Sequence, residues 1–149
     1  MDRPWIEQYP AGVPATVQTD LYRSLADLLD ESFKRFADRE AAVCMGVPLR
    51  FRDVDEQSAA LAAWLQARGL ERGARVALMM PNLPQYCVAI AAVLRAGFTV
   101  VNVNPLYTPR ELEHQLKDSG AQAIVILENF GTTLEAVLER TPIRHVVVA

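Results

Sequence analysis

The stretch VVNVNPLYTPREL, residues 100–112, decides the fold of this chain. It opens with apolar, β-branched residues typical of a buried strand, and Pro105 then ends the strand because proline cannot donate to a ladder. Thr108 is expected to cap a helix that has Pro109 at its first position, and Glu111 completes a capping box. The stretch therefore predicts a strand, a rigid corner and a helix start within thirteen residues.

The same order of strand and helix recurs along most of the chain. Helical spacing follows Ser24, which is a candidate helix cap, and fills residues 53–68. It resumes after Asn82, where Gln85 suggests a second capping box. Thr132 and Glu135 have the same spacing in a shorter helix. The continuous apolar run RVALMM (75–80) indicates a strand buried on both faces, as in parallel sheets. Further strands are expected at TVVNV (99–103), AIVIL (123–127) and HVVVA (145–149). This alternation predicts an α/β fold, a doubly wound and mainly parallel sheet flanked by helices.

Length and composition predict one domain preceded by an arm. Residues 1–19 hold three prolines and little periodicity, so we expect an extended N-terminal arm, with the α/β domain over 20–149. Cys44 and Cys87 lie in apolar runs and are expected to be buried, inert thiols of a cytoplasmic protein. No signal-peptide pattern and no apolar run of membrane-spanning length is visible in the sequence.

The charge of the chain argues against a nucleic-acid partner. The net charge is −3 with a pI near 5.4, whereas nucleic-acid surfaces show a clustered basic excess. The densest basic group, Arg68, Arg72 and Arg75, is interrupted by Glu71 and is interpreted as a solvated loop.

Candidate site residues follow the predicted strands, because ligands of doubly wound sheets bind at the carboxyl ends of strands. Asn82 is either a helix cap or a site residue. Asn102 interrupts an apolar strand, so its amide needs a partner; a neighbouring loop is favoured over a ligand cleft. Asn104 is equally ambiguous, and Tyr107 either lines a cleft or packs on the rim of the sheet.

No complete catalytic constellation is visible in the sequence. GxGxxG, GxxxxGK[ST] and GxSxG motifs are absent. Asp53, Asp55 and Glu56 are explained by the first turn of a helix, where negative charge is favourable. His114 and His145 show no metal-ligand spacing. The residues alone therefore predict no catalytic, cofactor-binding or metal-binding residue.

Three segments, RVALMMPNLPQY, LRAGFTVVNVNPLYTPREL and HQLKDSGAQAIVI, resemble the N-terminal region of bacterial long-chain fatty-acid–CoA ligases of the acyl-adenylate-forming superfamily. The resemblance runs from WIEQYP to HVVVA and implies the first part of the large N-terminal domain of such an enzyme. It implies a full-length ligase that uses ATP, Mg²⁺ and CoA to convert a long-chain fatty acid into acyl-CoA, AMP and pyrophosphate.

The resemblance also limits what this chain can do. The family's phosphate loop, Tyr-Gly-x-Thr-Glu stretch, ribose-binding Asp and late lysine all fall outside the 149 residues, so the segment alone is expected to be inactive and to bind no cofactor tightly. The resemblance leaves open whether the full-length protein contacts the inner membrane peripherally and whether it forms a homodimer. A stand-alone, non-enzymatic α/β module that binds a partner is the main alternative, and a flavodoxin-like or receiver-like domain is a weaker one.

Overall fold

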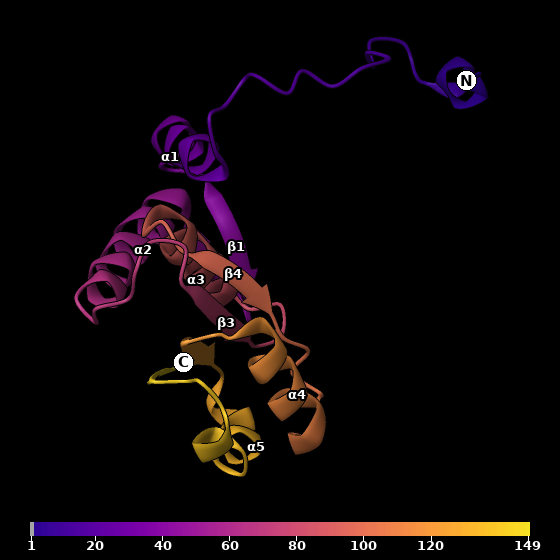
Figure 1. The fold of residues 1–149 in the computed structure, drawn as a ribbon. Helices are drawn as coiled ribbons and strands as arrows, with labels where there is room; N and C mark the ends of the chain where they lie inside the picture. Colours follow the sequence, from indigo (N-terminus) through magenta and orange to yellow (C-terminus); the bar gives the residue numbers. More distant parts are fainter. Residues whose placement is uncertain (1) are drawn as a thin grey trace.

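The computed structural model describes residues 2–149 and places an extended arm ahead of a layered α/β body (Figure 1). The arm contains one short 3-10 helix, η1 (Pro4–Gln8), and then runs without regular structure to α1 (Leu25–Arg35). Ser24 caps α1, since its side chain accepts a hydrogen bond from the Asp27 amide. The predicted cap at Ser24 is thereby confirmed.

Four parallel strands form the main sheet, in the order β4-β3-β5-β6. They are β3 (Arg75–Met79), β4 (Thr99–Asn102), β5 (Ala123–Ile126) and β6 (His145–Val148). The chain moves from β3 outward to β4, then crosses β3 to reach β5 and β6 on its other side. A separate antiparallel hairpin joins β1 (Glu40–Cys44) to β2 (Val47–Arg50).

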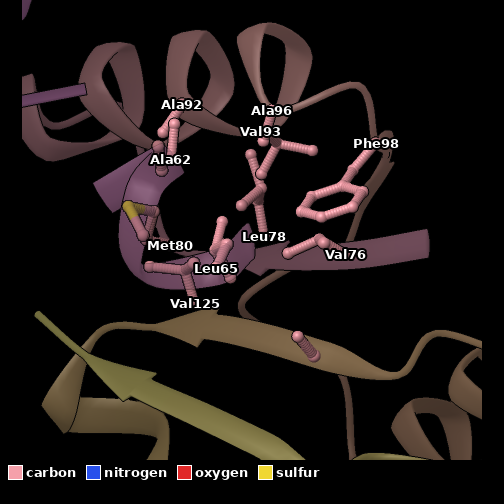
Figure 2. Close-up of a cluster of buried hydrophobic side chains, with 12 residues drawn as sticks. Ala62, Leu65, Val76, Leu78, Met80, Ala92, Val93, Ala96, Phe98 and Val125 are labelled. Atoms are coloured by element: carbon pink, nitrogen blue, oxygen red, sulfur yellow. The ribbon is translucent and has the colours of Figure 1, made fainter. Parts of the chain in front are cut away.

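Helices cover both faces of the sheet, so the predicted doubly wound α/β fold is confirmed. One face packs against α2 (Phe51–Gln66) and α3 (Pro84–Arg95). Figure 2 shows this core, in which Val93 on α3 lies over Val76 and Leu78 on β3. The other face packs against α4 (Pro109–Ser119) and α5 (Gly131–Glu135), with the short 3-10 helices η2 (Glu128–Phe130) and η3 (Leu138–Arg140) on either side of α5.

Strand β3 explains why the sheet needs both layers. Its side chains alternate, with Val76 and Leu78 in one core and Ala77 and Met79 in the other, and all four are fully buried. Complete burial of one such aliphatic side chain contributes about 1.5–3 kcal/mol. The apolar run that predicted a two-sided parallel strand therefore has the predicted environment.

A third core attaches α1 and the hairpin to the body. Phe33 of α1 and Val54 of α2 are buried together with Val88 of α3. Arg95, at the last turn of α3, lies beside this core and donates hydrogen bonds to Asp30 of α1 and Asp55 of α2. One cation thus links three helices.

The start of α4 matches its prediction at every position. Thr108 Oγ1 accepts a hydrogen bond from the Glu111 amide, and the Glu111 carboxylate accepts one from the Thr108 amide at 2.8 Å. Pro109 occupies the first helical position. The helix ends at Gly120, whose φ of 62° is a left-handed conformation that glycine adopts without steric cost.

Two other predicted caps are wrong. Helix α3 begins at Pro84 with Leu83 as N-cap and without a side-chain cap bond, so Asn82 lies one residue too early. Pro84 takes the first helical position, for which its fixed φ is suited. Thr132 does not cap α5, because η2 leads directly into the helix and places Thr132 inside it.

The expectation that both cysteines are buried is also wrong. Cys87 is exposed and Cys44 is half-buried. Helix α3 turns Val88, Ala89, Ala91 and Ala92 toward the cores, which leaves Cys87 facing outward. His114 is exposed on α4, as expected for a helix-surface residue.

Candidate functional site

The carboxyl ends of β3, β4 and β5 lie side by side, and we call this end of the sheet its carboxyl edge. Parallel register pairs Leu78 with Asn102 and Met79 with Ile126, so the segments that follow these strands emerge side by side. This edge holds the four residues that the sequence singles out. Asn82, Asn102 and Asn104 are exposed there, and Tyr107 is half-buried.

Asn102 is held by two helices on opposite faces of the sheet. The Tyr86 hydroxyl of α3 donates to Asn102 Oδ1, and Gln115 Nε2 of α4 donates to the Asn102 backbone oxygen at 2.9 Å. The amide thus finds its partner on a helix, rather than on the neighbouring loop that the sequence favoured. Sequence reasoning missed Tyr86 and Gln115, the two side chains that donate hydrogen bonds to Asn102.

Gln115 carries a buried acceptor atom in its side-chain amide. Among the described residues, its Oε1 is buried and accepts no hydrogen bond. A buried acceptor left unpaired costs about 1–3 kcal/mol. Gln115 also lines a hollow of about 710 Å³ with Tyr107 and His114.

Asn104 has a local structural role in the corner after β4. Its Oδ1 accepts a hydrogen bond from the Leu106 amide at 3.0 Å, and its backbone oxygen accepts one from the Tyr107 amide at 3.1 Å. A side chain that bonds the backbone two residues ahead forms an Asx turn. Tyr107 packs against the core under α4 and also lines the same hollow.

The structure divides the four candidates into two groups. Asn82 lines a hollow of about 320 Å³ together with Tyr86, which in turn bonds Asn102. Asn104 and Tyr107 lie at the corner that begins α4. No sequence pattern linked Tyr86 or Gln115 to Asn102, because each pair comes together only when a helix packs on the sheet.

The two glutamates on α4 are paired with neighbouring side chains of this chain. A hydrogen bond from the Thr108 side chain lowers the pKa of Glu111. Hydrogen bonds from the Lys117 and Arg140 side chains lower the pKa of Glu113.

Within residues 2–149, no group of three or more His, Cys, Asp or Glu side chains could hold a metal ion. No helix in the same part of the chain has the length and apolar character needed to cross a bilayer.

Comparison with known proteins decides the family. The family model described as AMP-binding enzyme matches residues 29–149. The chain belongs to the AMP-binding enzyme family. The matched region begins within α1 and contains the rest of the α/β body, whereas the whole arm precedes it.

Similar family members include ligases of fatty acids. The chain is 56% identical over 149 residues to a long-chain-fatty-acid–CoA ligase of Escherichia coli O6:H1, covering 99% of this chain and 27% of that protein. It is 40% identical over 126 residues to the ligase of the same name from Bacillus subtilis, covering 85% of this chain and 22% of that one.

A solved structure agrees with the fold. A long-chain-fatty-acid–CoA ligase from Archaeoglobus fulgidus matches with a TM-score of 0.79 at 28% identity, covering 95% of this chain and 30% of that one. The chain thus spans about a quarter of the length of the curated relatives that it matches.

Proposed function

We propose that the whole protein is a long-chain-fatty-acid–CoA ligase. It would join ATP, a long-chain fatty acid and CoA to give acyl-CoA, AMP and pyrophosphate, with Mg²⁺ bound to the triphosphate. The observation that carries the proposal is the 56% identity to the E. coli ligase, which extends over 99% of this chain. The alternative of a stand-alone partner-binding module is not favoured by this similarity.

Residues 1–149 would supply part of the scaffold rather than the chemistry. A triphosphate needs backbone amides from a glycine-rich loop and a free lysine beside them. Lys34 lies on α1, and Lys117 on α4 is bonded to Glu113 at 2.6 Å. These residues do not fit ATP–Mg²⁺, so we assign no catalytic step to them and expect this segment alone to bind neither ATP nor CoA tightly.

The candidate residues would shape the edge of the sheet that later loops complete. We assign Asn102 to a supporting role, because Tyr86 and Gln115 hold it from both faces. Asn82, Asn104 and Tyr107 are assigned to the rim of the same edge. We also propose that the chain divides into an arm, residues 1–19, and the first part of the AMP-binding domain, residues 20–149.

We further propose that the whole protein is cytoplasmic and that it contacts the inner membrane peripherally, where its long-chain substrate is found. We also propose that it forms a homodimer. Long-chain fatty acids partition into lipid, which supports the membrane contact. The acidic net charge of −3 supports the expectation of no nucleic-acid partner.

Acyl-CoA synthesis tests the proposed activity. The whole protein, given ATP, Mg²⁺, CoA and oleate, should form oleoyl-CoA and AMP, and acetate should be a poor substitute for oleate. If no fatty acid of any length supports acyl-CoA formation by the folded whole protein, the proposed activity is wrong.

A further inference from the structure

Four arginines gather where the strands of the main sheet begin, at the end opposite the carboxyl edge. Arg75 is the first residue of β3, and Arg144 directly precedes β6. Gln122 joins them, because its amide donates to the Arg75 backbone oxygen at 2.9 Å and its own backbone oxygen accepts from the Arg144 amide at 2.8 Å. Arg68 and Arg72 lie in the turn that leads from α2 into β3. We call these four arginines the arginine edge.

The arginine edge concentrates positive charge in an acidic chain. All four side chains are exposed, and none of them takes part in an ion pair found among residues 2–149. The turns that enter the four strands, residues 67–74, 96–98, 120–122 and 141–144, hold a single acidic residue, Glu71. The net charge of the chain is −3, so the positive charge is a property of this edge and not of the whole chain.

Two of the four arginines have a structural use. The Arg68 guanidinium lies over the Trp64 ring, 4.3 Å from its centroid. The Arg75 guanidinium lies beside Gly120, at the end of α4, where a cation is favourable. For the guanidinium groups of Arg72 and Arg144, the described part of the chain offers neither an ion pair nor an aromatic ring. These two charges can therefore bind a partner without breaking a contact.

An anionic lipid surface fits the arginine edge better than a nucleic acid does. Arg75 and Arg144 begin strands that are two positions apart, or about 10 Å, so the charges form a row that suits a flat partner. Trp64 is half-buried beside Arg68, and its ring also contacts the His145 ring at 6.5 Å. Tryptophan is enriched at the level of lipid headgroups, and guanidinium groups bind phosphate oxygens in pairs. A nucleic-acid surface would be expected in a chain with an overall basic excess.

We propose that the whole protein contacts an anionic lipid bilayer through the arginine edge. The guanidinium groups of Arg72 and Arg144 bind headgroup phosphates, and the Trp64 ring lies at the level of the headgroups. The inference rests on the peripheral membrane contact of the proposed function, to which it assigns a surface. Because the attraction is between exposed charges, it weakens as salt is added.

Sedimentation with vesicles measures this contact in the whole protein. One set of vesicles has three parts phosphatidylcholine to one part phosphatidylglycerol, and the other has phosphatidylcholine alone. Each basic residue near an anionic surface strengthens binding about fivefold, so the anionic vesicles should bind at least about tenfold more tightly. Raising the ionic strength from about 0.15 M to about 1 M shortens the Debye length from about 8 Å to about 3 Å and should release the protein.

Replacing both Arg72 and Arg144 with glutamine tests the assignment. Glutamine removes the charge and keeps part of the side-chain stem, so the urea midpoint should not change, whereas affinity for the anionic vesicles should fall about tenfold to thirtyfold. Arg35→Gln combined with Arg110→Gln is the matched control. It makes the same change in net charge at exposed positions of α1 and α4, and it should bind nearly as well as the unaltered protein.

Four results would overturn the inference: no preference of the folded whole protein for anionic vesicles, binding unchanged in the Arg72 and Arg144 variant, an equal loss in the control variant, or binding to soluble polyglutamate in place of vesicles. The last would assign the arginine edge to an acidic protein. Binding that ignores Arg72 and Arg144 leaves a membrane contact through another surface.

Ligase activity on oleate in detergent micelles is measured on the same samples. It should be the same in all variants, because neither arginine is assigned to the chemistry. An active enzyme that does not bind anionic vesicles refutes this inference and not the proposed activity, and an inactive enzyme that binds them through Arg72 and Arg144 refutes only the proposed activity.

Discussion

Replacing Arg95 with methionine should destabilise the chain through the junction of α1, α2 and α3. The guanidinium is 2.6 Å from an Asp30 oxygen and 2.7 Å from an Asp55 oxygen, and it also donates to the Asp55 backbone oxygen and lies over the Phe33 ring. Burial lowers the pKa of Arg95, but hydrogen bonds to the two carboxylates outweigh that effect and raise the pKa overall. The cation therefore persists throughout the accessible pH range.

The magnitude follows from the exposure of each partner. Asp30 and Asp55 are 47% and 42% exposed, so their ion pairs contribute about 0.5–1 kcal/mol each after solvent screening. The bond from the charged donor to the Asp55 backbone oxygen contributes about 1.5 kcal/mol, and the contact with Phe33 about 0.5 kcal/mol. Methionine preserves most of the packing, so the expected loss is about 3 kcal/mol, with Arg95→Lys intermediate because lysine lacks the planar fork.

Urea denaturation followed by circular dichroism measures this loss. With a slope of about 2 kcal/mol per molar urea, the midpoint of Arg95→Met should fall by about 1.5 M. Arg110→Met, at an exposed position of α4, is the control and should leave the midpoint nearly unchanged. A midpoint for Arg95→Met equal to that of the control would refute the assignment of Arg95 as the link among the three helices.

Three further predictions concern α4, acid stability and association. Thr108→Ala should lower the free energy of unfolding by about 1 kcal/mol through loss of the N-cap bond, and an unchanged urea midpoint would show that the cap is dispensable. Lys117 and Arg140 lower the pKa of Glu113 in the folded state, so the contribution of Glu113 to stability is present above the unfolded pKa and is lost as the pH falls through the folded pKa. Glu113→Gln should therefore flatten the fall in thermal midpoint below about pH 4.5. An unaltered pH profile of the thermal midpoint would contradict this. The isolated chain should self-associate at micromolar concentration, because β6 is an edge strand with Val146 and Val148 38% and 61% exposed; light scattering that reports only monomer would contradict it.

Local chemistry made the strands and the best helix starts predictable. Apolar runs such as residues 75–80 can be satisfied only between two layers, and Thr108, Pro109 and Glu111 fix a helix start without help from distant residues. Asn82 failed as a cap because two start signals compete within three residues, and Pro84 prevails. The sequence pattern cannot rank signals that lie so close together.

The candidate edge was predictable only in outline. Asn102 needed a partner, which the interruption of an apolar strand made clear, but Tyr86 and Gln115 are 16 and 13 residues away in sequence. Cys87 was misjudged for a related reason. Its neighbours are apolar, and only the packing of α3 determines which of them face inward.

Fatty-acid-dependent release of pyrophosphate tests the central claim most directly. The whole protein is mixed with ATP, Mg²⁺ and oleate without CoA, and pyrophosphate is measured beside the purified 149-residue chain under the same conditions. We predict release by the whole protein only when the fatty acid is present, and none by the 149-residue chain, whose lysines lie on α1 and α4. Turnover by the 149-residue chain, or silence from the folded whole protein with every fatty acid tried, would contradict the account.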